Sequence, residues 1–163
     1  MIHPQLLQRA AALGERLKAH GQTVGVAESS AGGLISAALL AVPGASAWYR
    51  GGAVVYTARA RAALLGLHRE DVAGMRSSSE PYALLLARTI RERLAADWGL
   101  AETGAAGPTG NGYGDAAGHT CLAITGPVEL AITLETGQSD RAGNMSAFTE
   151  RALDLLASAI AET

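Results

Sequence analysis

The sequence has few of the features that mark a disulfide-bonded, membrane-embedded or nucleic-acid-binding protein. Cys121 is the only cysteine among 163 residues, so no internal disulfide can form, and a reducing compartment fits this composition. No apolar run is long enough to span a bilayer, and the amino-terminal segment is typical of a charged amphipathic helix rather than a signal peptide. The formal net charge is −2 and no basic cluster is present. We therefore expect a cytoplasmic protein that binds neither nucleic acid nor membranes.

Aromatic residues are also scarce, at 4% of the chain, whereas hydrophobic residues make up 48% and glycine is abundant at 20 residues. Such a chain can bury a core of alanine, leucine and valine side chains, with many glycine-shaped turns. The sequence contains no repeat, linker or change of composition. We expect residues 1–163 to form a single domain.

Helical and extended patterns alternate along the chain. Helices are predicted over residues 6–17, 34–42, 58–65, 81–98 and 148–160, and strands over residues 23–27, 52–56, 100–103, 121–125 and 129–136. The last two strands meet at Gly126-Pro127 and are predicted to form an antiparallel hairpin. This order favours an α/β fold with a mixed, mostly parallel sheet covered by helices on both faces.

Two segments of small residues follow predicted strands. The backbone N–H groups and hydroxyls of residues 29–33 could hold an anion at a helix start, although a helix cap by Ser29 or Ser30 is the simpler explanation. The glycine-rich residues 104–118 could present backbone donors to a ligand, or form a surface loop without function. Because ligands bind beyond the carboxyl ends of parallel strands, both segments could border one crevice.

The four histidines show no paired ligand spacing, so we predict no metal site. His119, at the end of the glycine-rich segment, can exchange protons near neutral pH or have no role. Each of three further residues has a simple structural explanation when it is considered alone. Ser46 is explained as a loop serine, Tyr56 as an aromatic residue of a strand and Arg61 as a solvated residue of a helix. A serine becomes nucleophilic only beside a base, and a guanidinium remains protonated in proteins.

Five segments, in order along nearly the whole chain, resemble the CinA C-terminal domain, the family of nicotinamide-nucleotide amidohydrolases. They are AESSAGG at 27–33, VPGASAWYRGGAVVYTARARAALLGL at 42–67, SEP at 79–81, TGAAGP at 103–108 and SDR at 139–141, where Ser139 replaces the family's glycine. The resemblance implies a three-layer α/β/α sandwich with a mixed sheet. It also implies a homo-oligomer.

The activity implied by the resemblance is hydrolysis of the carboxamide of nicotinamide mononucleotide, a small-molecule substrate, to nicotinic acid mononucleotide and ammonia. The family uses a Ser/Tyr/Lys group without metal or cofactor. Matched position by position, the nucleophile falls on Ser46 and the tyrosine on Tyr56, and Arg61 occupies the lysine position. The predicted substrate-binding residues are Glu28, Ser29, Ser30, Gly32, Gly33, Gly104, Gly107, Gly110 and Arg141.

Three departures from the family pattern leave two functions open. Arg61 replaces a lysine that can act as a base, Asp115 stands where the family often has a lysine, and Glu102 lies in a strand that is otherwise apolar. The first hypothesis is an amidohydrolase in which the glycine-rich segment stabilises the oxyanion and His119 or a Tyr56 phenolate replaces the missing base. The alternative is a catalytically degenerate nucleotide-binding or assembly protein with the same fold.

Overall fold

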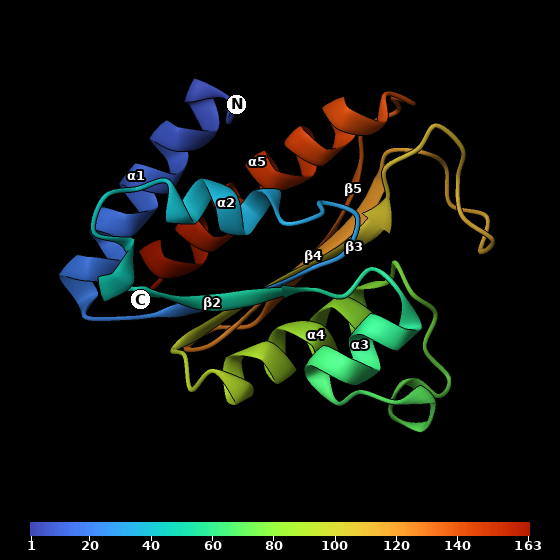
Figure 1. The fold of residues 1–163 in the computed structure, drawn as a ribbon, viewed down its shortest axis with the longest axis horizontal. Coiled ribbons are helices and arrows are strands. Elements are labelled where there is room, and N and C mark those ends of the chain that lie inside the picture. Colours follow the sequence, from blue (N-terminus) through green and yellow to red (C-terminus); the bar gives the residue numbers. More distant parts are fainter.

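The computed structural model describes all residues from 1 to 163 and contains one five-stranded sheet. The strands lie in the order β2-β1-β3-β4-β5 (Figure 1). Their bounds are β1 Val24–Glu28, β2 Tyr49–Val54, β3 Trp98–Ala105, β4 His119–Thr125 and β5 Leu130–Glu135. β1 pairs in parallel with β2 and β3, whereas the β3–β4 and β4–β5 pairs are antiparallel. Only β4 therefore runs against the other strands, which confirms the predicted mixed sheet.

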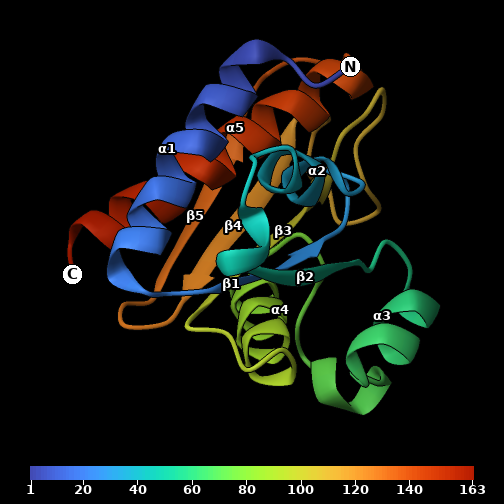
Figure 2. The same cartoon turned by 60° about the vertical axis from the view of Figure 1, so that its left-hand side comes forward.

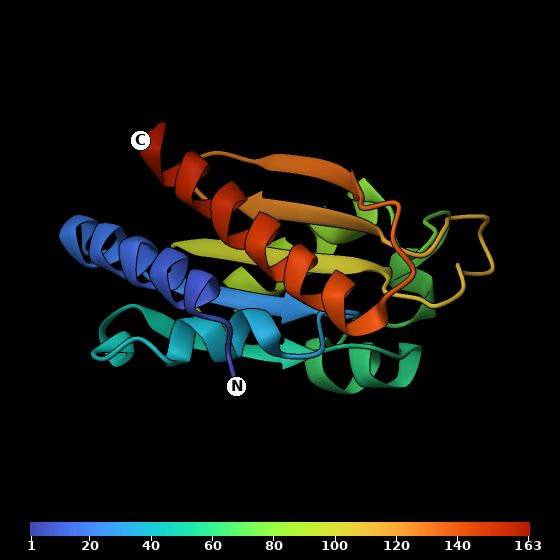
Figure 3. The same ribbon diagram turned by 90° about the horizontal axis from the view of Figure 1, so that it is seen from above.

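Helices cover both faces of the sheet and complete the predicted three-layer sandwich (Figures 1 and 2). Helices α1 (Pro4–His20), α2 (Leu34–Leu40) and α5 (Arg141–Ala161) lie side by side over one face (Figure 3). Helices α3 (Ala58–Leu65) and α4 (Glu80–Arg93) cover the other face. Two short 3-10 helices, η1 (Ala45–Ala47) and η2 (Arg69–Val72), lie in the connections. None of the helices has the length and apolarity needed to cross a membrane.

Two hydrophobic clusters fill the spaces between the layers. The cluster beneath α1, α2 and α5 contains 22 buried residues, and the cluster beneath α3 and α4 contains 11. Successive side chains of a strand point to opposite faces, so Leu122 and Ile124 of β4 enter the larger cluster and Cys121 and Ala123 enter the smaller one. Small side chains on this second face allow α4 to lie close to the sheet.

Helix α4 departs from its sequence prediction at its carboxyl end. Ser79 caps its start by accepting a hydrogen bond from the Tyr82 N–H, and Pro81 occupies the first turn, as its sequence suggests. The helix ends at Arg93, five residues before the predicted end at 98. Ala95 has a φ of 48°. This left-handed residue lets the chain reverse and enter β3 at Trp98.

Candidate functional site

The carboxyl ends of β1, β2 and β3 meet at one edge of the sheet and carry two pockets. The first, the Arg61 pocket, has a volume of about 300 Å³. Its lining includes Ser29 after β1, Tyr56 after β2, Arg61 of α3, Tyr82 of α4 and Gly104 of β3. Residues that are far apart in the sequence meet here because parallel strands bring their carboxyl ends to the same edge.

The second pocket, the glycine-loop pocket, has a volume of about 280 Å³ and lies beside the first. The two pockets share Tyr56, Gly104 and Asn111. Residues 106–118, which connect β3 to β4, form the glycine loop and project beyond the sheet (Figure 1). The predicted substrate-binding residues that line this pocket are Ser30, Gly104, Gly107, Gly110 and Arg141.

Arg61 is the only charged residue that lines the Arg61 pocket. It is 7% exposed, and its Nε donates to the Leu67 carbonyl at 3.1 Å. Its Nη1 donates to the Tyr82 hydroxyl at 3.4 Å, and its Cζ lies 5.9 Å from the centre of the Tyr82 ring. All of these partners are neutral, and Arg61 forms no ion pair in the chain.

Arg141, at the start of α5, is the only charged residue that lines the glycine-loop pocket. Its Nη1 donates to the Gly107 carbonyl, and its Nη2 donates to the Tyr56 hydroxyl at 3.2 Å. This exposed guanidinium joins the loop after β2 to the glycine loop. The Gly107–Pro108 peptide bond in that loop is cis.

The structure does not bring Ser46 to Tyr56 and Arg61 within the chain. Ser46 is an exposed residue of η1, which precedes β2, whereas Tyr56 follows β2. A strand rises about 3.3 Å per residue, so the six residues of β2 hold the two side chains roughly 20 Å apart. Ser46 lines neither pocket.

Ser29, rather than Ser46, lines the pocket that Tyr56 and Arg61 share. It follows β1 directly, lines the Arg61 pocket, and its hydroxyl has no hydrogen-bond partner in the chain. A signal in the sequence could have identified it. In a parallel pair, the residues that follow the strands lie at one end of the sheet and the residues that precede them lie at the other. Ser29 and Tyr56 follow β1 and β2 and therefore lie at the same end, whereas Ser46 precedes β2 and lies at the opposite end.

Glu28, predicted to bind substrate, instead caps helix α2. Its buried carboxylate accepts hydrogen bonds from the N–H groups of Gly33, Ile35 and Ser36 at 3.2, 2.9 and 2.9 Å. Burial raises the pKa of Glu28, although the hydrogen bonds from Ser36 and Ile35 lower it. Glu28, Gly32 and Gly33 all lie outside the two pockets.

The unexpected Glu102 has a similar structural role. Its fully buried carboxylate accepts hydrogen bonds from the N–H groups of Ser29 and Ala31 at 3.1 and 2.8 Å, and from the hydroxyls of Ser30 and Thr120. Of the donors after β1 that could hold an anion, the N–H groups of Ser29, Ala31 and Gly33 and the hydroxyl of Ser30 are thus bound by carboxylates of the protein itself. Neither serine caps α2, because the residue at its N-cap is Gly33, which has no side chain to do so.

Asp115 does not add a negative charge to either pocket. Its carboxylate lies 2.5 Å from Arg76 Nη1 and accepts a hydrogen bond from the Asn111 side-chain amide at 2.9 Å. The hydrogen bond from Arg76 lowers the pKa of Asp115. Within the glycine loop, the N–H groups of Gly107, Thr109 and Gly110 have no acceptor in the chain, so they remain available to a ligand.

His119 is buried beneath the glycine loop and lines neither pocket. Its Nε2 lies 2.8 Å from the Ser78 carbonyl, and its Nδ1 lies 2.5 Å from Glu135 Oε1. Burial lowers the pKa of His119, but the interactions with Glu135, Ser78 and Asp115 outweigh it, so the pKa is raised. With both ring nitrogens bound, His119 is not available as the base that the sequence left unidentified.

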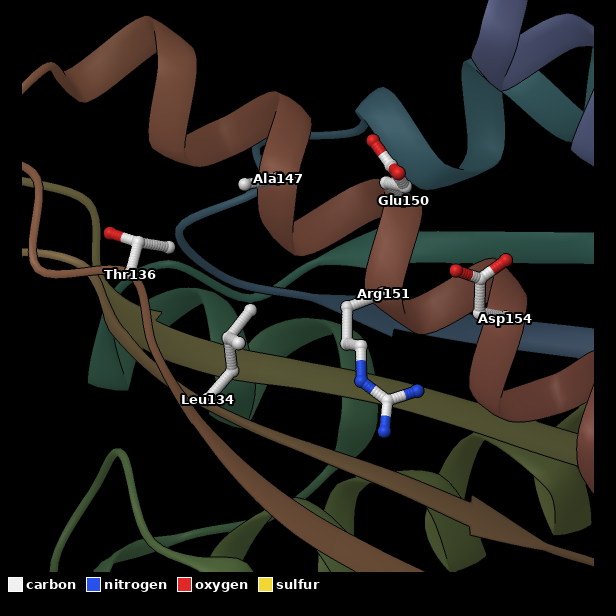
Figure 4. A pocket seen from close by; sticks show the side chains of 6 residues that line it. All are labelled: Leu134, Thr136, Ala147, Glu150, Arg151 and Asp154. Atoms are coloured by element: carbon white, nitrogen blue, oxygen red, sulfur yellow. The ribbon is translucent and has the colours of Figure 1, made fainter.

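A separate hollow of about 240 Å³ lies between α5 and β5 (Figure 4). Its two acidic residues, Glu150 and Asp154, form ion pairs with Arg9 of α1. No residue of the glycine loop or of the segments after β1 and β2 lines it. The chain contains no group of three or more His, Cys, Asp or Glu side chains that could hold a metal ion.

The fold and the two pockets define a three-layer α/β protein with two adjacent pockets at the carboxyl ends of its parallel strands. The CinA C-terminal domain profile matches residues 7–160, and the chain belongs to this family. A CinA-like protein of Gloeobacter violaceus is 41% identical over 138 residues, which are 83% of this chain and 32% of that protein. A CinA-like protein of Chlorobium limicola is 36% identical over 86% of this chain and 34% of its own length. The chain thus spans about a third of these relatives.

Solved structures support the same family assignment. A competence/damage inducible protein from Agrobacterium tumefaciens has a TM-score of 0.89 and is 29% identical, with 97% of each chain covered. A CinA superfamily protein from Enterobacter cloacae has a TM-score of 0.88 and is also 29% identical, with 95% of this chain and 92% of that chain covered.

Proposed function

We propose that the chain is an amidohydrolase that converts the carboxamide of nicotinamide mononucleotide, or of a closely related pyridine nucleotide, to a carboxylate and ammonia. The observation that carries this proposal is the meeting of Ser29, Tyr56 and Arg61 around one pocket. Tyr56 and Arg61 hold the positions of the family's catalytic tyrosine and lysine, and Ser29 supplies a hydroxyl without a partner. The geometry therefore favours Ser29 over Ser46 as the nucleophile of a single chain.

In this mechanism the Ser29 oxygen attacks the carboxamide carbon. The Ser29 proton passes through the Tyr56 oxygen to the amide nitrogen, ammonia leaves, and water then hydrolyses the acyl-serine ester to release the carboxylate. Tyr56 suits this relay because it is the only residue with an ionisable proton that lines both pockets. Arg61 supplies a fixed positive charge beside the reacting carbonyl, where charge develops in the transition state.

The test is to incubate the purified protein with nicotinamide mononucleotide and to measure ammonia. Ser29→Ala should reduce the rate by roughly 10⁴-fold or more, because nucleophile removal has effects of this size in serine hydrolases. Ser46→Ala is the matched control and should retain the rate. Loss of the rate in Ser46→Ala alone would instead assign the nucleophile to Ser46, brought to the pocket from a second copy in a homo-oligomer.

A second candidate is a nucleotide-binding protein without turnover, and the observation that favours it is Arg61 itself. A guanidinium does not accept a proton, whereas a lysine in the same place can do so when it is desolvated. If the unmodified protein releases no ammonia but Arg61→Lys does, the chain is a family member whose catalytic base has been lost. Ligand binding without ammonia release from either protein would support a binding function.

A further inference from the structure

Arg61 holds a buried positive charge that nothing in the chain neutralises. Its partners are the Leu67 carbonyl and the hydroxyl and ring of Tyr82. Buried arginines normally pair with a carboxylate, because removing a charge from water is costly without a counter-charge. No aspartate or glutamate lines the Arg61 pocket, so an anionic group from a ligand is the missing partner.

The rest of the Arg61 pocket indicates which kind of anionic group it would take. Tyr56, Tyr82 and Tyr113 line it, and such rings pack against a planar aromatic ring. Arginine binds a carboxylate through two parallel hydrogen bonds in one plane. A carboxylate attached to an aromatic ring matches both features.

The glycine-loop pocket fits a different anion. It combines the exposed guanidinium of Arg141 with the unbound N–H groups of Gly107, Thr109 and Gly110. A phosphate has three terminal oxygens and needs several donors at once, which backbone N–H groups in glycine-rich turns provide. The two pockets are adjacent, so one ligand can reach both arginines.

We infer that the Arg61 pocket binds the carboxylate of an aromatic ring whose phosphate lies beside Arg141. This inference deepens the proposed function, because it concerns the ligand of the same site. The carboxylate product of the deamidation carries an anionic group at both ends, whereas the carboxamide substrate carries one only at the phosphate. The site therefore holds the product more tightly than the substrate.

The two mononucleotides are a matched pair of probes, because nicotinic acid mononucleotide and nicotinamide mononucleotide differ only in this group. Calorimetric titrations on the Ser29→Ala protein measure both affinities without turnover. The carboxylate form should bind about tenfold or more tightly, the usual gain when a hydrogen bond becomes charge-assisted. Equal affinities, or tighter binding of the carboxamide, would overturn the inference.

Two further variants in the same background assign the preference to a residue. Arg61→Gln should reduce the ratio of the two affinities to about one, whereas Arg59→Gln, which changes an exposed arginine of the same helix, should leave it unchanged. A preference that persists in Arg61→Gln, or that disappears in Arg141→Gln instead, would contradict the proposed placement. Should Arg61→Gln not fold, Arg61→Met, which keeps most of the side chain's length without its charge, should also reduce the ratio to about one.

The titrations test the carboxylate preference and the ammonia assay tests the activity, so either result can be negative while the other is positive. Ammonia release from the unmodified protein without a preference for the carboxylate supports the proposed activity and overturns this inference. A preference that depends on Arg61, without ammonia release, supports the inference and overturns the activity.

Discussion

Arg141 Nη2 donates a hydrogen bond to the Tyr56 hydroxyl at 3.2 Å, across 85 residues of sequence. The same guanidinium also binds the Gly107 carbonyl. Arg141 thus fixes the tyrosine of one pocket to the backbone of the other. Tyr56 lines both pockets, so this contact lies at the wall that they share.

The first prediction concerns Arg141 itself. Arg141→Gln removes the only charge in the glycine-loop pocket and releases both Tyr56 and Gly107. Hydrogen bonds to charged groups contribute about 1.5–3 kcal/mol, so the KM for nicotinamide mononucleotide should rise about tenfold or more. Arg151→Gln is the control, because Arg151 is an exposed residue of the same helix that forms no ion pair and lines neither pocket. Equal effects of the two changes would show that Arg141 does not contact the substrate.

The second prediction concerns the shape of the glycine loop. A Cβ added at Gly110 would lie 2.0 Å from the Asp115 carbonyl oxygen, whereas one at Gly112 would meet nothing within 4 Å. Gly110→Ala must therefore displace the loop backbone and with it the N–H groups near the pocket. Because these groups are proposed to bind the phosphate, we expect the KM for nicotinamide mononucleotide to rise about tenfold or more in Gly110→Ala, and Gly112→Ala to retain the KM of the unmodified protein. An unchanged KM in Gly110→Ala would exclude the loop from substrate binding.

Much of the fold could be predicted from the sequence, because alternating apolar patterns and glycine-rich turns define the helices and strands along the chain. The rule that ligands bind beyond parallel strands also predicts that residues 29–33 and 104–118 border one crevice. Side-chain direction could not be predicted in the same way. Glu28 and Ser29 are adjacent, yet the first caps a helix and the second lines a pocket. The Ser29 backbone is held by Glu102, a partner 73 residues further along the chain that local sequence patterns do not reveal.

The third prediction tests that partner. Glu102→Ala leaves the N–H groups of Ser29 and Ala31 and the hydroxyl of Ser30 without their acceptor inside the protein. Unsatisfied buried donors cost about 1–3 kcal/mol each and are not fully additive, so the free energy of unfolding should fall by about 3 kcal/mol or more. Urea unfolding measures this change. Glu15→Ala, at an exposed position of α1, is the control and should change stability by less than about 0.5 kcal/mol.

The last prediction concerns His119, whose charged form links β4 to Glu135, Asp115 and the Ser78 carbonyl. Its pKa is raised in the folded protein, whereas the unfolded chain titrates near the ordinary value of about 6.5. A raised pKa means that the folded state binds the proton more tightly. The stabilisation is fully present below pH ~6.5 and is lost as the pH rises through the higher folded value.

His119→Gln removes this proton-linked stabilisation. Urea unfolding at pH 6 and at pH 9 should therefore show a larger loss of stability at pH 6 than at pH 9, because the unmodified protein has already lost the contribution at the higher pH. Gln8→Ala, which changes an exposed side chain without an ionisable group, should show no such difference between the two pH values. A loss that is the same at both pH values would mean that His119 stabilises the fold by packing alone, with no charged interaction beneath the glycine loop.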